Sequence, residues 1–391
     1  MAYLGVLHLL ERGLWPSGWP VLTHGLVLAG VGVAITLLTR ALGNPGDVEL
    51  LVDNIHVSGG AEDLRRLPSL VPVSLLCIAA GGALGPEAPL VQTTGTVGSG
   101  AARRAGLDAG ATRIVTLAGM ASGFTVLFGA PLGSAVFALE ILHRRGLEYY
   151  EALMPAVLGS VAGYAVHLVA SGAGLAPVWD LPEAGPLGPA DLGWALACGV
   201  VGAGVAAAFV AVHRLLRAAS ERLPPGGRPL AGGVALGLLA AVSPYALTFG
   251  EAQLGRVTST RLALGALGLA AAAKLLGSTV SLATGWKGGF IIPLFFVGAA
   301  LGRAGHLLVP GADEAVLVAG LMVACAVGVT KTPIGSVLVV TEMAGLTLLP
   351  PVLVASVVTL ALTSRLSMIE SQRGRVEPAT GHPPVGERSD G

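Results

Sequence analysis

Glu87 is the residue with the clearest chemical potential, because it lies between two prolines in the run Gly85-Pro86-Glu87-Ala88-Pro89. Proline is favoured in the first turn of a helix, where the N–H groups have no intrahelical partner. These N–H groups and the positive end of the helix dipole attract anions. A carboxylate here can occupy the anion site itself and vacate it when protonated or displaced. The alternative is an exposed helix-terminal glutamate that only complements the dipole.

A second run, Gly288-Gly289-Phe290-Ile291-Ile292-Pro293, has the form expected of a wall opposite Glu87. Glycines let the backbone approach a ligand closely, and the apolar residues up to Gly302 predict a helix that begins here. The N–H groups of that helix can hold a dehydrated anion without a full positive charge, which keeps binding weak enough for release. The alternative is a closely packed helix end without a ligand.

A third element occurs twice in the chain. Pro131-Leu132-Gly133-Ser134 is followed after five residues by Glu140, and Pro333-Ile334-Gly335-Ser336 is followed in the same way by Glu342. The Glu87 run precedes the first copy, and the Gly288 run precedes the second. Two related elements in the same order indicate a duplication. Broken helices at equivalent places favour an inverted pair with the site between them. The pairing of the two glutamates predicts a structural role, such as binding helix-end amides.

The composition indicates that lipid surrounds these motifs. Of 391 residues, 53% are hydrophobic and 12% are charged, with a mean hydropathy of +0.77; a soluble domain carries about 25% charged residues. The zero net charge argues against a nucleic-acid partner. Cys77, Cys198 and Cys325 lack the spacing of a disulfide framework, metal site or redox centre. We find no cluster typical of an enzyme and expect no cofactor or bound metal.

Runs free of Asp, Glu, Lys and Arg predict the membrane helices, which need about 20 apolar residues. Residues 13–39 are predicted to be the first integral helix. Gly123, Gly129 and Pro131 predict that the run 114–139 forms two helical pieces. Lys274 and Lys287 flank apolar runs, so their side chains are expected to extend to the interface.

The expected organisation is an N-terminal segment (1–20), a membrane domain (21–369) and a disordered, polar tail (370–391). The membrane domain divides into repeats at about 21–185 and 190–369. Clusters of arginine suggest cytoplasmic edges, and we expect the C-terminus to be cytoplasmic.

Together, the Glu87 run, the Gly289 run and the duplicated Pro-x-Gly-Ser motif resemble the CLC family of chloride channels and proton/chloride exchangers. The resemblance covers roughly residues 20–370 and suggests a divergent bacterial-type member without a regulatory C-terminal domain. It implies an all-α polytopic membrane protein with two inverted-topology repeats of broken and tilted helices. It further implies a homodimer, with one pore in each subunit, in a bacterial-type plasma membrane.

The resemblance also implies roles for individual residues. Glu87 would be the external gating glutamate, whose side chain blocks or opens the anion path. The main chain near it would bind the anion, at Gly85, Ala88, Gly289, Phe290, Ile291 and Ile292.

Several positions depart from the family pattern. Pro86 stands where the family usually has Arg or Lys, and Ala88 stands where it has Gly. Pro86 therefore removes an N–H donor and a positive charge, which should weaken anion binding at the outer site.

The family's serine loop is absent, and its place falls in Asp53-Asn54-Ile55-His56 or in Ser58-Gly59-Gly60. An ionised Asp53 would repel an anion, so Asn54 or Ser58 is the expected donor. The family's pore tyrosine falls at Ile369 and its internal proton-transfer glutamate at Ile141, and neither isoleucine can replace the lost group.

We therefore expect passive or weakly proton-coupled chloride transport gated by Glu87. The alternatives are a proton-coupled chloride antiporter and a broken-helix secondary transporter for another solute. Apart from Glu87, Glu140 and Glu342, the apolar runs have almost no carboxylates, which disfavours cation coordination.

Overall fold

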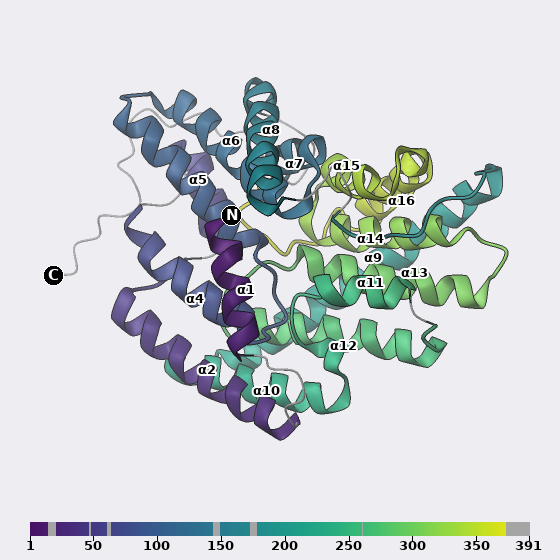
Figure 1. Cartoon of the computed structure of the whole chain (residues 1–391), viewed down its shortest axis with the longest axis horizontal. Helices are drawn as coiled ribbons and strands as arrows, with labels where there is room; N and C mark the ends of the chain where they lie inside the picture. Colours follow the sequence, from purple (N-terminus) through teal and green to yellow (C-terminus); the bar gives the residue numbers. More distant parts are fainter. Residues whose placement is uncertain are drawn as a thin grey trace.

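The computed structural model describes residues 1–14, 21–46, 48–60, 64–143, 149–172, 178–259 and 261–372. Within these ranges the regular structure is helical, apart from one isolated β-bridge (Figure 1). The α-helices are α1 (Ala2–Leu14), α2 (Val21–Leu42), α3 (Val48–Ser58), α4 (Leu67–Ala79), α5 (Glu87–Arg104), α6 (Ala109–Phe128), α7 (Pro131–Glu140), α8 (Leu153–Ser171), α9 (Pro189–Ser220), α10 (Arg228–Val242), α11 (Glu251–Ser259), α12 (Leu264–Ala283), α13 (Ile291–Leu308), α14 (Glu314–Thr330), α15 (Pro333–Ala344) and α16 (Leu349–Leu362). Short 3-10 turns lie at η1 (Leu64–Arg66), η2 (Tyr150–Ala152), η3 (Pro225–Gly227), η4 (Pro244–Ala246) and η5 (Leu346–Leu348).

The predicted break in the run 114–139 is confirmed. Helix α6 ends at Phe128, and the next residue, Gly129, adopts a left-handed conformation with φ of 64°, as is common where a helix terminates. Helix α7 then begins at Pro131. Gly123 lies inside α6 and does not interrupt it, so Gly129 and Pro131 together make the break.

The same sequence of elements recurs in the second half of the chain. Helices α13 to α16 repeat the order and approximate lengths of α5 to α8. The side chains of Asp108 and Asp313 cap α6 and α14 by accepting hydrogen bonds from backbone N–H groups. Helix α7 packs against α15, and Figure 1 shows these two helices near the middle of the upper half of the molecule. The fold is thus an all-α membrane architecture of two inverted repeats.

Among the described residues, six helices are long and apolar enough to cross a membrane. They are Thr23–Leu42, Ala109–Phe128, Tyr150–Ser171, Pro189–Ser220, Leu264–Ala283 and Ile291–Leu308. The prediction of a first integral helix over 13–39 is wrong in its bounds, because α1 ends at Leu14 and α2 begins at Val21. The charge-free run includes the last two residues of α1, and the absence of charge could not distinguish these from α2.

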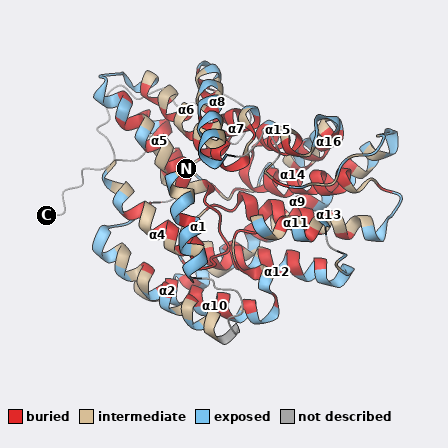
Figure 2. Ribbon diagram, viewed as in Figure 1, coloured by how far each residue is buried: buried red, intermediate tan, exposed pale blue. Residues whose placement is uncertain are grey.

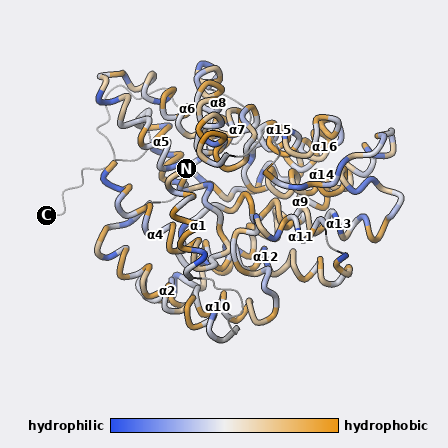
Figure 3. The backbone as a smooth tube through the Cα atoms, viewed as in Figure 1, coloured by the Kyte–Doolittle hydropathy of each residue, from blue (hydrophilic) through white to orange (hydrophobic). Residues whose placement is uncertain are grey.

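The outer surface of the helices is apolar, whereas the centre is closely packed. On α8 the side chains of Leu158 and Val169 are exposed, as are Leu238 and Val242 on α10. Figure 2 shows exposed positions on the outer helices, and Figure 3 shows hydrophobic residues throughout them. Helix α14 is buried at every position from Ala315 to Thr330. Helices that are apolar both on the outer surface of the protein and in its interior are typical of a protein that spans a bilayer.

The expectation that Lys274 extends to the interface is wrong. Its side chain is fully buried, and Nζ donates to the carbonyl oxygens of Leu247 at 2.6 Å and Thr248 at 2.7 Å, and to Gln253 Oε1 at 3.0 Å. These acceptors lie where the chain is not helical or at the start of α11, so their oxygens are available and replace water around the ammonium group. Lys287 is half-buried, and its Nζ donates to the carbonyl of Gly46 at 2.8 Å.

Candidate functional site

Two helix N-termini meet at the centre of the candidate site. Helix α5 begins at Glu87 and α13 begins at Ile291. Just before them, Gly85 and Gly289 form an antiparallel β-bridge. The Gly85 N–H donates to the Gly289 carbonyl at 2.8 Å, and the Gly289 N–H donates to the Gly85 carbonyl at 2.6 Å. The bridge fixes the two helix starts against each other, so the two sequence motifs do form facing walls.

The carboxylate of Glu87 is buried between these walls. The residue has no exposed surface, and the Ile292 N–H donates to Glu87 Oε1 at 2.6 Å. The other oxygen, Oε2, has no hydrogen-bond partner among the described residues. The carboxylate of the first repeat therefore accepts a hydrogen bond from an N-terminal amide of α13 in the second repeat. Such amides are the groups that bind anions at helix ends.

Glycine is needed at both bridge positions because the carboxylate lies directly over them. A Cβ atom added to Gly85 or to Gly289 would overlap the carboxyl group of Glu87. Any larger residue would displace the side chain from its amide. The alternative of a glutamate exposed at the interface is therefore excluded for Glu87.

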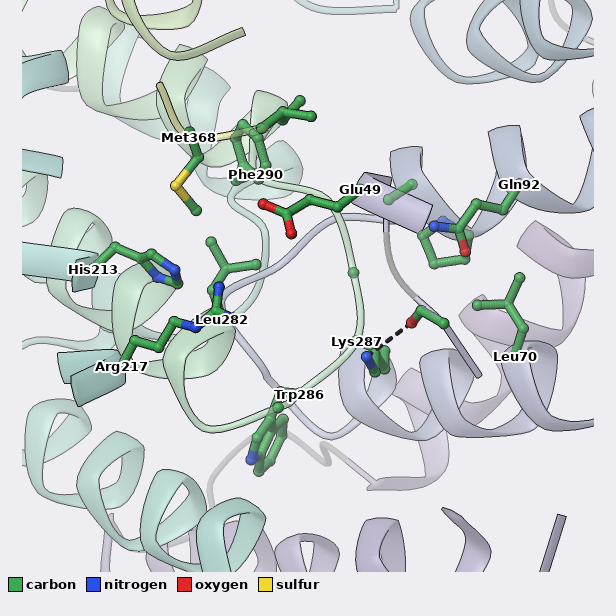
Figure 4. Close-up of a pocket in the computed structure, with 16 residues that line it drawn as sticks. Glu49, Leu70, Gln92, His213, Arg217, Leu282, Trp286, Lys287, Phe290 and Met368 are labelled. Carbon is green, nitrogen blue, oxygen red and sulfur yellow. Dashed lines mark hydrogen bonds between the residues drawn. The ribbon is translucent and has the colours of Figure 1, made fainter. Parts of the chain in front are cut away.

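Two cavities adjoin the site, and Ala88 and Phe290 line both of them. The larger cavity has a volume of about 140 Å³ and includes Ile369 in its wall (Figure 4). The smaller cavity has a volume of about 20 Å³ and includes Ile141. Ile369 and Ile141, the two positions to which the resemblance assigns the pore tyrosine and the internal glutamate, therefore each line one of the two cavities.

The smaller cavity is lined by apolar residues throughout: Leu51, Val52, Ala88, Val91, Met120, Phe124, Ile141, Gly289, Phe290 and Ile291. A cavity of this size has room for about one water molecule, but a water is stable only where it finds two to four polar partners. No side chain in its wall can hold or relay a proton.

Asn54 is not brought to the site. It lies in the second half of α3 and lines neither cavity. Gly46, two residues before that helix, and Glu49, in its first turn, line the larger one. Ser58 is the last residue of α3, and its side chain lies outside the described part of the chain. The turn-forming run Gly43-Asn44-Pro45-Gly46 was the sequence signal for a loop that leads into this cavity.

The two repeated glutamates bind helix-end amides, as predicted. Glu140 Oε2 accepts hydrogen bonds from the N–H groups of Ile334 at 3.0 Å and Gly335 at 2.7 Å. Glu342 accepts from Leu132 at 3.3 Å and from Gly133 at 2.5 Å. Each carboxylate thus caps the helix of the other repeat, which complements the dipole of that helix.

Gln92 was missed by the sequence reasoning. It is 2% exposed and lines the larger cavity, together with Ala88 and Pro89 of the same helix. The spacing of these three residues places them on one face of α5. This spacing was the available signal, but an isolated glutamine in a helix does not by itself indicate a ligand.

The sequence model described as "Voltage gated chloride channel" matches residues 25–364. A chloride/fluoride channel protein of Pseudomonas syringae pv. tomato is 28% identical over 374 residues, which cover 89% of this chain and 78% of that protein. A voltage-gated ClC-type chloride channel ClcB of Citrobacter koseri is 27% identical, covering 75% of this chain and 72% of that protein.

Two solved structures share the fold. A CLC-type fluoride/proton antiporter superposes with a TM-score of 0.82 at 23% identity, covering 95% of this chain and 93% of that one. A slow cyanobacterial Cl⁻/H⁺ antiporter superposes with a TM-score of 0.81 at 19% identity, covering 93% and 90%. At these identities the likeness concerns the architecture alone.

Proposed function

The chain belongs to the voltage-gated chloride channel (CLC) family, and we propose that it carries chloride or a similar small anion along a path gated by Glu87. The single observation that carries this proposal is the hydrogen bond from the Ile292 N–H to Glu87 Oε1 at 2.6 Å. A side chain in this position competes with a mobile anion for the same donor. Anion transport is the activity of the family, and the gating role of Glu87 is our proposal.

Main-chain groups would hold the anion once Glu87 moves away. We propose this role for the segments Gly85–Ala88 and Gly289–Ile292, which face each other across the β-bridge. Oriented amide dipoles can stabilise a dehydrated anion without the strong binding that a full positive charge would give.

We propose that the transport is passive or weakly coupled to protons. The support is Ile141, which lines an apolar cavity of about 20 Å³ where a proton carrier would be needed. A proton-coupled antiporter is the second candidate, because the two solved structures compared above are described as antiporters. Fluoride is a second candidate ion, because the Pseudomonas relative is described as a chloride/fluoride channel protein. A secondary transporter of another design is excluded by the family membership.

The test is to record chloride efflux and proton movement together from vesicles that contain the purified protein. We expect chloride to flow down its gradient. Glu87→Gln should change that rate by about tenfold or more, because a charge-assisted hydrogen bond is worth about 1.5–3 kcal/mol. Glu183→Gln is the matched control, because Glu183 is exposed and lines neither cavity.

The outcomes separate the candidates. Proton movement driven uphill by a chloride gradient would identify an antiporter, and its absence would identify passive transport. Repeating the efflux with fluoride decides between the two ions. Failure to move chloride, fluoride, bromide or nitrate would contradict the proposal.

We further propose that the protein works as a homodimer in a bacterial-type plasma membrane, with residues 21–369 as its membrane domain and a cytoplasmic C-terminus. The apolar side chains exposed on α8 and α16, such as Leu158 and Val357, are compatible with a second copy or with lipid. Cross-linking the protein in the same vesicles tests the number of subunits, and a product no larger than one chain would contradict the dimer.

A further inference from the structure

Residues 366–372 bring Ile369 into the wall of the larger cavity without forming a helix. Helix α16 ends at Leu362, and the chain from 366 to 372 has no regular structure. Ile369 is nevertheless only 2% exposed and lines the cavity, next to Met368, which Figure 4 labels. Because this segment has no helical hydrogen bonds of its own, bonds to other groups must hold it in place.

Gln372 supplies two of these bonds with one side chain. It is 4% exposed, and its Nε2 donates to the carbonyl of Ile141 at 2.9 Å and to that of Thr330 at 2.7 Å. A carboxamide nitrogen carries two N–H donors, so both are used. The oxygen Oε1 has no partner among the described residues, and turning the carboxamide over would set this oxygen against both carbonyl oxygens. The two carbonyls therefore determine how the side chain lies.

The two acceptors lie at helix ends in different repeats. Ile141 directly follows α7, and Thr330 is the last residue of α14. Carbonyls at a helix C-terminus lack an intrahelical partner, and a buried one that stays unpaired is costly. Ile141 also lines the smaller cavity. The carboxamide of Gln372 thus connects the backbone beside the smaller cavity to the segment that lines the larger one.

The other end of the segment is held as well. Ser367 Oγ donates to the carbonyl of Ile369 at 3.1 Å, and the Arg214 side chain on α9 donates to the carbonyl of Ser367 at 3.0 Å. These bonds precede Ile369 in the chain, whereas those of Gln372 follow it. Ile369 is therefore fixed from both sides, so its side chain keeps its place in the cavity wall.

We propose that Gln372 is a positioning residue for the anion path, which fixes Ile369 in the wall of the larger cavity and thereby limits the size of the anion that passes. Gln372 lines neither cavity, so it acts through Ile369 and not by binding the anion. This inference rests on the proposed function, because it adds a size limit to the same path.

The experiment compares the efflux rates of iodide and chloride from vesicles that contain the unchanged protein or Gln372→Met. Methionine has a similar length but cannot donate to either carbonyl, so Ile369 can yield to the larger ion. We expect the ratio of the iodide rate to the chloride rate to rise about fivefold, the effect of losing one hydrogen bond. This ratio does not depend on how much of the protein is folded, so a merely structural role of Gln372 would leave it unchanged.

Thr359→Val is the matched control on the neighbouring helix. Thr359 is buried, its Oγ1 donates to the carbonyl of Gly199 at 2.8 Å, and it lines neither cavity. Valine has nearly the same shape but no hydroxyl group, so this variant loses a buried bond between α16 and α9. Its stability should fall, whereas its ratio of iodide to chloride rates should stay the same.

Gln372→Asn provides a second measurement, because it keeps the donor but withdraws it by one methylene group. We expect a smaller rise in the ratio than for Gln372→Met. An unchanged ratio in a folded Gln372 variant, or an equal rise in Thr359→Val, overturns the inference and leaves the proposed function intact. Failure of both Gln372 variants to fold also overturns it, because Gln372 would then serve the fold as a whole. Absence of chloride efflux from the unchanged protein would instead contradict the proposed function.

Discussion

The two repeats share one frame but differ at the residue that begins the central helix. In both, a glycine two residues before that helix forms half of the β-bridge, at Gly85 and Gly289. The first repeat then starts α5 with Glu87, whereas the second starts α13 with Ile291. The repeat places main-chain amides on both sides of the site, but only the first repeat adds a carboxylate. We propose that this carboxylate competes with an anion for the amides of the second repeat.

A second difference lies where α6 and α14 end. Gly129 and Lys331 both adopt left-handed conformations, with φ of 64° and 62°. The conformation costs a non-glycine residue about 1–2 kcal/mol. Lys331 offsets this cost because its buried Nζ donates to the carbonyls of Gly328 and Thr363, each at 2.7 Å. In the second repeat, the residue at the break therefore also binds the end of α16. In the first repeat, Gly129 ends α6 and has no side chain to make such a contact.

The largest effect is expected from adding a methyl group where α7 and α15 pack closely against each other. Gly133→Ala would place a Cβ atom against the backbone of Val339, and Gly335→Ala would place one against the backbone of Phe137. Because backbone cannot move aside easily, we expect each change to cost about 3 kcal/mol, the upper end of ordinary overpacking. The measurement is the thermal unfolding midpoint of the purified protein in detergent.

Gly204→Ala is the control for these two variants. Gly204 lies in α9 with open space where a Cβ atom would stand, so alanine should stabilise that helix by up to about 1 kcal/mol. If only one of the two contact variants were destabilised, the contact between α7 and α15 would not be equivalent in the two repeats.

The repeated helical architecture was predictable from the sequence, whereas part of the candidate site was not. The Pro-x-Gly-Ser motif and its glutamate form a short pattern, so their duplication could be recognised and their capping role predicted. Glu87 was predictable because a charge between two prolines in an apolar run is unusual and because the helix start is a local feature.

The missed features depend on contacts between distant segments. Lys274 is stabilised by carbonyls of Leu247 and Thr248, which are available only because the chain is not helical there. Asn54 was expected at the site because its side chain can donate a hydrogen bond. The turn before α3 brings Gly46 and Glu49 to the cavity instead. Gln92 lines a cavity whose wall also comes from segments far apart in the sequence, around Glu49, Leu70, His213, Trp286 and Ile369.

An intermediate loss of stability is expected from replacing the two glutamates that each cap a helix of the other repeat. The loss should differ between the repeats. Glu140→Gln removes a charge that is 1% exposed and binds two helix-end amides, so we expect a loss of about 2–3 kcal/mol. Glu342→Gln removes a similar pair of bonds at a less buried position, so its loss should be smaller. Unfolding midpoints of the two variants under identical conditions test the order, and the reverse order would contradict it.

The smallest effect is expected at the two N-caps, where the repeats again differ in one contact. Asp108 accepts one hydrogen bond, from the Ala111 N–H at 2.7 Å, and Asp108→Ala should cost about 1 kcal/mol. Asp313 caps α14 through the Val316 N–H at 3.2 Å and also accepts from the Gly185 N–H at 2.9 Å.

Asp313→Ala should therefore lower the unfolding midpoint more than Asp108→Ala, by one further hydrogen bond of about 0.5–1.5 kcal/mol. The asparagine variants separate the two contributions, because asparagine still caps a helix well but has only one carbonyl oxygen to accept with. Asp108→Asn should then be nearly neutral, while Asp313→Asn should retain only part of the stability. Equal effects of the two asparagine changes would show that the bond to Gly185 contributes nothing and that the capped helices α6 and α14 are energetically alike.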